Sequence, residues 1–169
     1  MSSEGASPAR VAVIGLGTMG IAIARLFQDH GLDVHAFDTR VSGAESLPAS
    51  AGTNLRVCPS IRECVENADF VFEAVSEDLA VKESVLREVS RWATGIIASN
   101  TSTFMPSVLA AFVDRPERLL VAHFFNPADV VPLVEVVPHA GTSIEAREAV
   151  ERLLRDAGKV LDVDQRRHQ

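Results

Sequence analysis

The sequence has few cysteines and no long apolar segment, and both shortages limit what the protein can be. Its 169 residues include two cysteines, Cys58 and Cys64, which are too few for a disulfide framework. We expect both thiols to be reduced, as in a soluble intracellular protein, and we predict a cytoplasmic location. No apolar run is long enough to cross a bilayer, and the opening MSSEGASPAR has no apolar signal-peptide core. The sequence therefore argues against a membrane-spanning protein and against a disulfide-rich secreted one.

Positive charge is also scarce. Lysine and arginine number 16 against 23 aspartates and glutamates, which gives a net charge of −7. An acidic surface disfavours nucleic acid and anionic membranes as partners, although backbone N–H groups can still bind a phosphate locally. There are no repeats and no low-complexity linker. We expect a loose tail over 1–9, one globular domain over 10–163, and a second tail over 164–169.

Short apolar runs alternate with helical patterns along the chain, which is typical of parallel strands joined by crossover helices. The expected strands are 10–17 (running into a glycine turn), 33–38, 55–58, 69–75, 95–100, 119–125, 132–137 and 159–163. The expected helices are 19–31 (ended by Gly31), 60–68 (capped by Ser60), 77–92, 106–112 and 143–157. Segment 39–54 is rich in Ser, Ala, Gly and Pro and holds at most a short helix. This order predicts an α/β fold with a doubly wound, mostly parallel sheet of the Rossmann type.

The first strand runs into the glycine turn GLGTMG, with Gly15, Gly17 and Gly20 between a strand and a helix. In such a turn the first glycine permits a tight bend, the second lets a pyrophosphate approach the backbone, and the third lets helix and strand pack closely. Asp38 ends the second strand eighteen residues later, close to the usual spacing of about 20. Its carboxylate would accept hydrogen bonds from ribose hydroxyls and repel a 2′-phosphate. The pattern predicts NAD rather than NADP, a preference that Arg40 could soften.

Polar residues follow the later strands, where ligands bind in open α/β sheets. SNTS (99–102) follows one strand, HFFNP (123–127) ends another, and Glu135 lies within an apolar run. A buried carboxylate is costly unless it is paired. If the two strands are neighbours at their carboxyl ends, His123 and Glu135 would solve each other's burial problem and form a general acid/base pair. The alternative is a His123 that serves only in the apolar core.

Four motifs in this order, GLGTMG, DFVFEAVSEDLAVKESVL, ASNTS and HFFNP-x5-LVEVV, are similar to the NAD-binding domain of the L-3-hydroxyacyl-CoA dehydrogenase family. The resemblance covers most of residues 10–163. It implies that His123 accepts the proton of the substrate hydroxyl, that Glu135 is its partner, and that Ser102 and Asn126 contact the substrate oxygen and the nicotinamide end of the cofactor. We predict no metal site. The residues predicted to bind NAD are Gly15, Leu16, Gly17, Thr18, Met19, Gly20, Asp38, Arg40, Ala74, Glu77, Lys82, Asn100, Ser102 and Asn126.

The implied reaction is NAD-dependent oxidation of a 3-hydroxyacyl substrate to the ketone, or its reverse, with hydride passing to the nicotinamide and the proton to His123. Ser102 could instead be the nucleophile of a hydrolase triad with His123 and Glu135. No nucleophile elbow surrounds Ser102, so the sequence favours the oxidoreductase, an enzyme of fatty acid metabolism.

The sequence departs from the family pattern in three places, so other substrates and other functions stay open. Segment 39–54 is short and nearly without lysine, whereas family members carry a long arm there that meets CoA. NPADVVPLVEVV is more similar to relatives that oxidise free hydroxy acids such as carnitine or gulonate, or carrier-protein thioesters. The family continues into a helical domain, whereas this sequence stops at DVDQRRHQ. The chain could therefore be an NAD-binding module with little turnover, or an enzyme completed by a helical partner domain or a second copy of itself.

Overall fold

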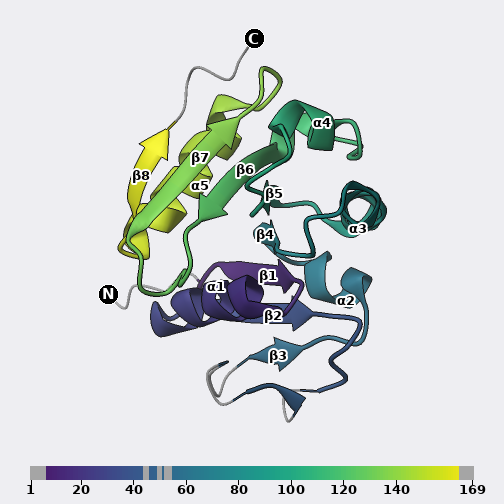
Figure 1. The fold of residues 1–169 in the computed structure, drawn as a ribbon, viewed down its shortest axis with the longest axis vertical. Helices are drawn as coiled ribbons and strands as arrows, with labels where there is room; N and C mark the ends of the chain where they lie inside the picture. The colour runs from purple at the N-terminus through teal and green to yellow at the C-terminus, as the bar shows by residue number, and fades with distance from the viewer. Residues whose placement is uncertain (1–6, 44–45, 49–50, 52–54, 164–169) are drawn as a thin grey trace, which may run out of the picture.

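One mixed sheet organises the molecule. The computed structural model describes residues 7–43, 46–48, 51 and 55–163, and within them the strands form an eight-stranded sheet in the order β3-β2-β1-β4-β5-β6-β7-β8 (Figure 1). The strand order reverses between β1 and β4, as in a doubly wound sheet, so the predicted fold class is confirmed. The strands are β1 (Arg10–Ile14), β2 (Asp33–Phe37), β3 (Arg56–Val57), β4 (Phe70–Glu73), β5 (Ile96–Ser99), β6 (Leu119–Phe124), β7 (Leu133–Pro138) and β8 (Val160–Val163).

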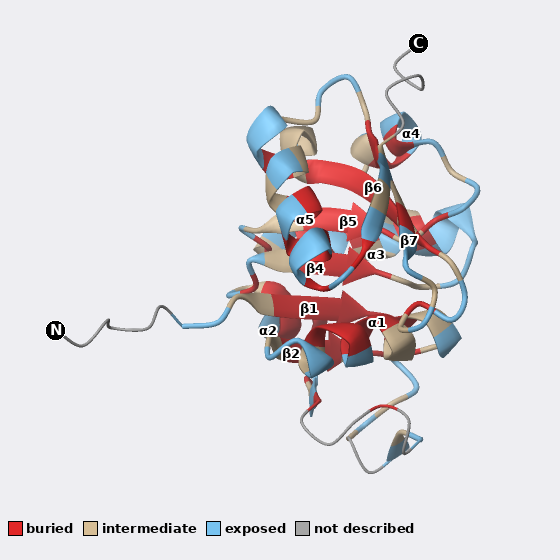
Figure 2. Ribbon diagram, turned by 90° about the vertical axis from the view of Figure 1, so that its left-hand side faces the viewer, coloured by how far each residue is buried: buried red, intermediate tan, exposed pale blue. Residues whose placement is uncertain are grey.

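The helices cover the two faces of the sheet, and alternation along each strand gives each face its own core. On β1, Val11 and Val13 pack against the face covered by α1 and α5. Ala12 and Ile14 pack against the face covered by α2, α3 and α4. Figure 2 shows the central strands buried between these layers. The helices are α1 (Thr18–Asp29), α2 (Ile61–Val65), α3 (Leu79–Trp92), α4 (Pro106–Ala110) and α5 (Ile144–Asp156).

Polar caps set where several helices begin. Ser60 Oγ accepts from Glu63 N at 3.2 Å, which confirms the predicted start of α2. Gly31, at φ +77°, supplies the left-handed turn after α1. Helix α3 begins at Leu79, two residues after the predicted start, because Asp78 Oδ1 accepts from Val81 N at 3.0 Å and caps the helix. Glu77 therefore lies in the loop before α3.

The sheet departs from parallel at one place that matters for the site. Strand β7 pairs with β6 in the antiparallel direction, whereas the other pairs are parallel. The expectation that His123 and Glu135 both lie at carboxyl ends is therefore wrong for Glu135, which lies in the first half of β7. The strands are joined by the short connection 125–132, too short for a parallel crossover.

The described residues bear on two further expectations, one about membrane spans and one about segment 39–54. No helix among the described residues is long and apolar enough to cross a membrane. Parts of segment 39–54, where we expect at most a short helix, lie outside the described residues, as do 1–6 and 164–169 of the two predicted tails.

Candidate active site

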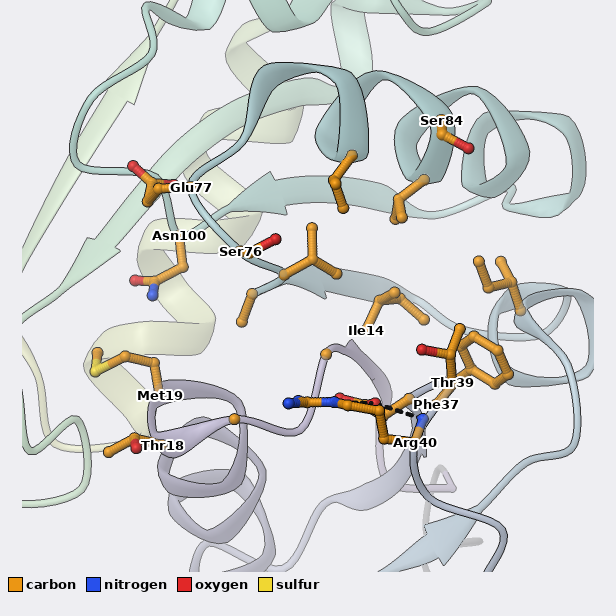
Figure 3. A pocket seen from close by; sticks show the side chains of 18 of the residues that line it. Ile14, Thr18, Met19, Phe37, Thr39, Arg40, Ser76, Glu77, Ser84 and Asn100 are labelled. Carbon is orange, nitrogen blue, oxygen red and sulfur yellow. Dashed lines mark hydrogen bonds and ion pairs between the residues drawn. The ribbon is translucent and has the colours of Figure 1, made fainter.

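A cavity of about 1080 Å³ lies along the carboxyl ends of β1, β2, β4, β5 and β6. Figure 3 shows Phe37, Thr39 and Arg40 at one end of it and Glu77 and Asn100 at the other. The cavity thus joins the two groups of residues that the sequence singled out separately. Its lining includes the predicted residues Gly15, Gly17, Thr18, Met19, Asp38, Arg40, Ala74, Glu77, Asn100, Ser102, His123 and Asn126.

The glycines of the turn differ in what surrounds them. Gly15 has φ +97°, and a Cβ there would stand 2.7 Å from the carbonyl oxygen of Ala74. A Cβ on Gly20 would stand 1.8 Å from the carbonyl oxygen of Gly15. A Cβ on Gly17 would meet nothing within 4 Å, because this glycine faces the open cavity. Gly15 and Gly20 are thus required by the fold, whereas the bare backbone at Gly17 borders space that a ligand can fill.

Asp38 is held by four hydrogen bonds at the end of β2. Oδ2 accepts from Leu16 N at 2.8 Å and Arg40 Nη2 at 3.0 Å, and Oδ1 accepts from Arg40 N at 2.8 Å and Arg40 Nε at 3.1 Å. The hydrogen bonds from the Arg40 side chain are the main reason that the pKa of Asp38 falls to about 2. The Arg40 side chain is 74% exposed, so ribose hydroxyls could displace it at little cost.

His123 and Glu135 are direct partners. They are opposite each other in the β6–β7 register, and His123 Nδ1 lies 3.0 Å from Glu135 Oε2. A carboxylate only accepts hydrogen bonds, so Nδ1 carries a proton, and in the neutral form of the imidazole Nε2 is the nitrogen with the free lone pair. The Glu135 side chain is 39% exposed, so the expectation that it is buried in its apolar run is wrong. The pair forms because register places the two side chains together, with water still reaching the carboxylate.

The turn after β5 and the loop after β6 bring further polar groups to the His123 end. Asn100 Oδ1 accepts from Phe124 N at 2.9 Å, which ties the turn to the residue after His123. Ser102 and Asn126 line the same cavity as His123. The structure therefore groups the four predicted catalytic residues, although Glu135 reaches the cavity only through His123. Among the described residues no cluster of three His, Cys, Asp or Glu side chains could hold a metal.

Three residues predicted to bind cofactor lie behind the cavity wall. Leu16 is buried and gives its N–H to Asp38, and Gly20 packs against Gly15. Lys82 is 1% exposed, and its Nζ lies 2.7 Å from Glu73 Oε1 and 3.1 Å from Glu77 Oε1. The cofactor-binding roles of these three residues stay predictions.

Sequence reasoning missed two sets of residues. One is Glu73, whose only signal was a carboxylate inside the apolar strand 69–75. The other is the wall at the Asp38 end, which no motif marks because it is assembled from separate elements. That wall includes Phe37, Thr39, Pro59, Ser60, Ile61, Ser84 and Glu88.

Comparison with known sequences gives one family. The family described as "3-hydroxyacyl-CoA dehydrogenase, NAD binding domain" matches residues 10–56 and 39–163. An L-carnitine dehydrogenase of Pseudomonas aeruginosa is 38% identical over 166 residues, covering 86% of this chain and 50% of that protein. The L-carnitine dehydrogenase of Staphylococcus epidermidis is 33% identical over 179 residues, covering 95% and 55%. The chain thus spans about half the length of these relatives.

Solved structures agree with this comparison. A 3-hydroxyacyl-CoA dehydrogenase from Archaeoglobus fulgidus superposes with a TM-score of 0.79 at 33% identity, covering 92% of this chain and 56% of that one. The 3-hydroxybutyryl-CoA dehydrogenase of Escherichia coli gives a TM-score of 0.81 at 30% identity, covering 94% and 38%. The fold and the sequence therefore point to the same group of proteins.

Proposed function

Because the chain belongs to the 3-hydroxyacyl-CoA dehydrogenase family, as its NAD-binding domain, we propose that it serves the NAD-dependent oxidation of a 3-hydroxyl group on a small hydroxyacyl substrate. NAD is the cofactor of this domain. The observation that carries the proposal is that one cavity has the glycine turn and Asp38 at one end and His123 at the other. A dinucleotide that begins at Asp38 would bring its nicotinamide half toward His123.

The residues present fit the cofactor. The open space at Gly17 leaves room for a pyrophosphate against bare backbone, and the N-terminus of α1 begins there, at Thr18. Asp38 would take the ribose hydroxyls in place of Arg40. When bound, NAD⁺ supplies a hydride acceptor at its nicotinamide ring.

The chain itself supplies the proton chemistry. With Nδ1 bound to Glu135, the neutral imidazole of His123 can take the hydroxyl proton at Nε2 as the hydride leaves the carbon that bears the hydroxyl, which becomes the ketone carbon. Glu135 then stabilises the imidazolium that forms. Ser102 and Asn126 would donate hydrogen bonds to the substrate oxygen and fix its position. In the reverse direction Nε2 returns the proton.

Among substrates, we propose a free 3-hydroxy acid of the carnitine type rather than a CoA ester. The L-carnitine dehydrogenases, at 33% and 38% identity, support this choice. The test is an assay of the purified chain, in excess over NAD⁺, with L-carnitine, gulonate and 3-hydroxybutyryl-CoA. NADH formation with the CoA ester alone would contradict the substrate class.

An NAD-binding module with little turnover is a second candidate. The chain spans about half the length of the L-carnitine dehydrogenases, and in this second candidate the substrate wall comes from a helical partner domain or from a second copy. In that case the chain alone binds NADH but produces almost no NADH from NAD⁺ with any of the substrates. Adding a helical domain from a relative then restores the rate of NADH formation. We place the activity in the cytoplasm, where the free thiols Cys58 and Cys64 would stay reduced.

Cofactor preference tests the role of Asp38. We expect NADH to bind more tightly than NADPH, because the Asp38 carboxylate repels a 2′-phosphate. Asp38→Ala should weaken NADH binding about tenfold or more, since hydrogen bonds to charged groups contribute about 1.5–3 kcal/mol each. Fluorescence titration of both reduced cofactors measures the effect.

Arg40→Gln is the matched control for Asp38→Ala. Freeing Asp38 from its exposed partner should strengthen NADH binding by no more than about fivefold, because an exposed ion pair contributes about 0–1 kcal/mol. It should also weaken NADPH binding. A wild-type preference for NADPH would mean that Arg40, not Asp38, governs this end of the cavity.

A further inference from the structure

A buried carboxylate lies beneath the cavity at the carboxyl end of β4. Glu73 is fully buried. Its Oε1 accepts from Lys82 Nζ at 2.7 Å and Val75 N at 3.0 Å, and its Oε2 accepts from Ser99 Oγ on β5. Glu73 thus joins two neighbouring strands, the loop after β4 and helix α3.

Lys82 carries this connection to the cavity surface. Its ammonium also donates to the Val75 carbonyl at 3.2 Å and pairs with Glu77 Oε1 at 3.1 Å. The other oxygen of Glu77 accepts from Thr101 Oγ1 at 2.9 Å and Ser102 N at 3.2 Å. A continuous path therefore runs from Glu73 through Lys82 and Glu77 to the turn that holds Ser102.

The Lys82 ammonium pairs with the carboxylates of both Glu73 and Glu77, which differ in burial. Burial alone would raise the pKa of Glu77, but hydrogen bonds from Thr101 and Lys82 and the charge of Lys82 outweigh burial and lower it. One ammonium thus serves two carboxylates, one sealed in the core and one 40% exposed at the cavity. Fully burying an ion costs several kcal/mol, and apolar side chains of similar volume often stabilise a fold as well. A gain in folding stability therefore does not explain why charged side chains occupy the two buried positions 73 and 82.

We propose that Glu73 and Lys82 are positioning residues for the nicotinamide half of the cofactor site. Neither side chain reaches the cavity, since they are 0% and 1% exposed. They act through Glu77, which they hold against the 101–102 turn, so that this part of the wall of the cavity that His123 also lines has one geometry before ligand arrives. This inference rests on the proposed function, because it assigns these residues to one half of the NAD site.

The test removes both buried charges together. In Glu73→Gln with Lys82→Met, the amide can still accept from Val75 N and donate to Ser99 Oγ, and the methionine fills the volume of the lysine stem. We expect thermal unfolding close to wild type, because no fully buried charge is left without a partner, and Glu77, which loses the Lys82 ammonium, is 40% exposed to water. NADH affinity should fall about tenfold, whereas ADP, which lacks the nicotinamide half, should bind within about twofold of wild type. Glu77→Ala should match the double variant, and adding it should change NADH affinity no further, because the residues act on one path.

Ser90→Ala is the matched control on the same helix. Ser90 Oγ accepts from Asp114 N at 2.7 Å, also in a buried place, so this variant should lower the unfolding temperature without changing either affinity. A double variant that binds NADH as wild type does, or that loses ADP and NADH equally, would overturn the positioning role. A wild-type chain that binds neither ligand would overturn the proposed function, and this inference with it.

Discussion

Replacing Gly20 by alanine is expected to lower the unfolding temperature by roughly 6–12 °C. The added Cβ would stand 1.8 Å from the carbonyl oxygen of Gly15, and backbone cannot move aside as a side chain can. Overpacking usually costs about 1–3 kcal/mol, and this contact belongs at the upper limit. For a chain of this size about 1 kcal/mol shifts the unfolding temperature by roughly 2–4 °C. NADH binding should be lost together with stability, as measured by thermal unfolding and fluorescence titration.

Gly17→Ala separates binding from folding. A Cβ at Gly17 meets nothing within 4 Å, so the unfolding temperature should stay at the wild-type value. NADH affinity should still fall at least about tenfold, since the methyl group fills the space that a pyrophosphate needs. If Gly17→Ala bound NADH normally, the cofactor would have to lie elsewhere in the cavity.

The second large effect concerns His123, the proposed proton acceptor. His123→Ala is expected to reduce NADH formation by about 10²–10⁴-fold, the usual contribution of a positioned general base. NADH affinity should stay within about twofold of wild type, because the cavity is lined by many other groups. The measurement is NADH absorbance under excess protein, with whichever substrate the wild-type chain oxidises fastest.

Glu135→Gln supplies the comparison. The amide can still accept from Nδ1 of His123, but it carries no charge to stabilise the imidazolium, so the rate should fall less than in His123→Ala. A His123→Ala variant that keeps its rate would remove His123 from the reaction and favour water as the base.

Most of the fold could be predicted from the sequence because its signals are local. The glycine turn between β1 and α1, the Ser60 cap and the continuous apolar run of β1 each depend on a few adjacent residues. The direction of β7 could not be obtained in this way. An apolar run has the same pattern whichever way the strand points. The only sequence signal for the antiparallel pairing of β6 and β7 is the connection 125–132, which is too short for a parallel crossover.

Residues of the candidate site could be predicted where they belong to a sequence motif. They could not be predicted where only tertiary packing brings them together. His123 and Glu135 were paired because a carboxylate in an apolar run needs a partner, and the pairing follows from strand register. Lys82 was assigned to the cofactor, yet helix α3 turns its side chain inward to Glu73. Nothing in local periodicity distinguishes a lysine that faces a ligand from one that supports the wall behind it.

The antiparallel ladder between β6 and β7 also limits how this site can evolve. His123 and Glu135 meet because they share a register position, and side chains alternate between the faces of a strand. A slip of one residue would place Val134 or Val136, both fully buried, opposite His123 and turn the carboxylate to the other face. Insertions that bulge out within 125–132 leave the ladder untouched. The loop that carries Asn126 at the cavity can therefore change in length without separating His123 from Glu135, whereas a shift of β7 separates them.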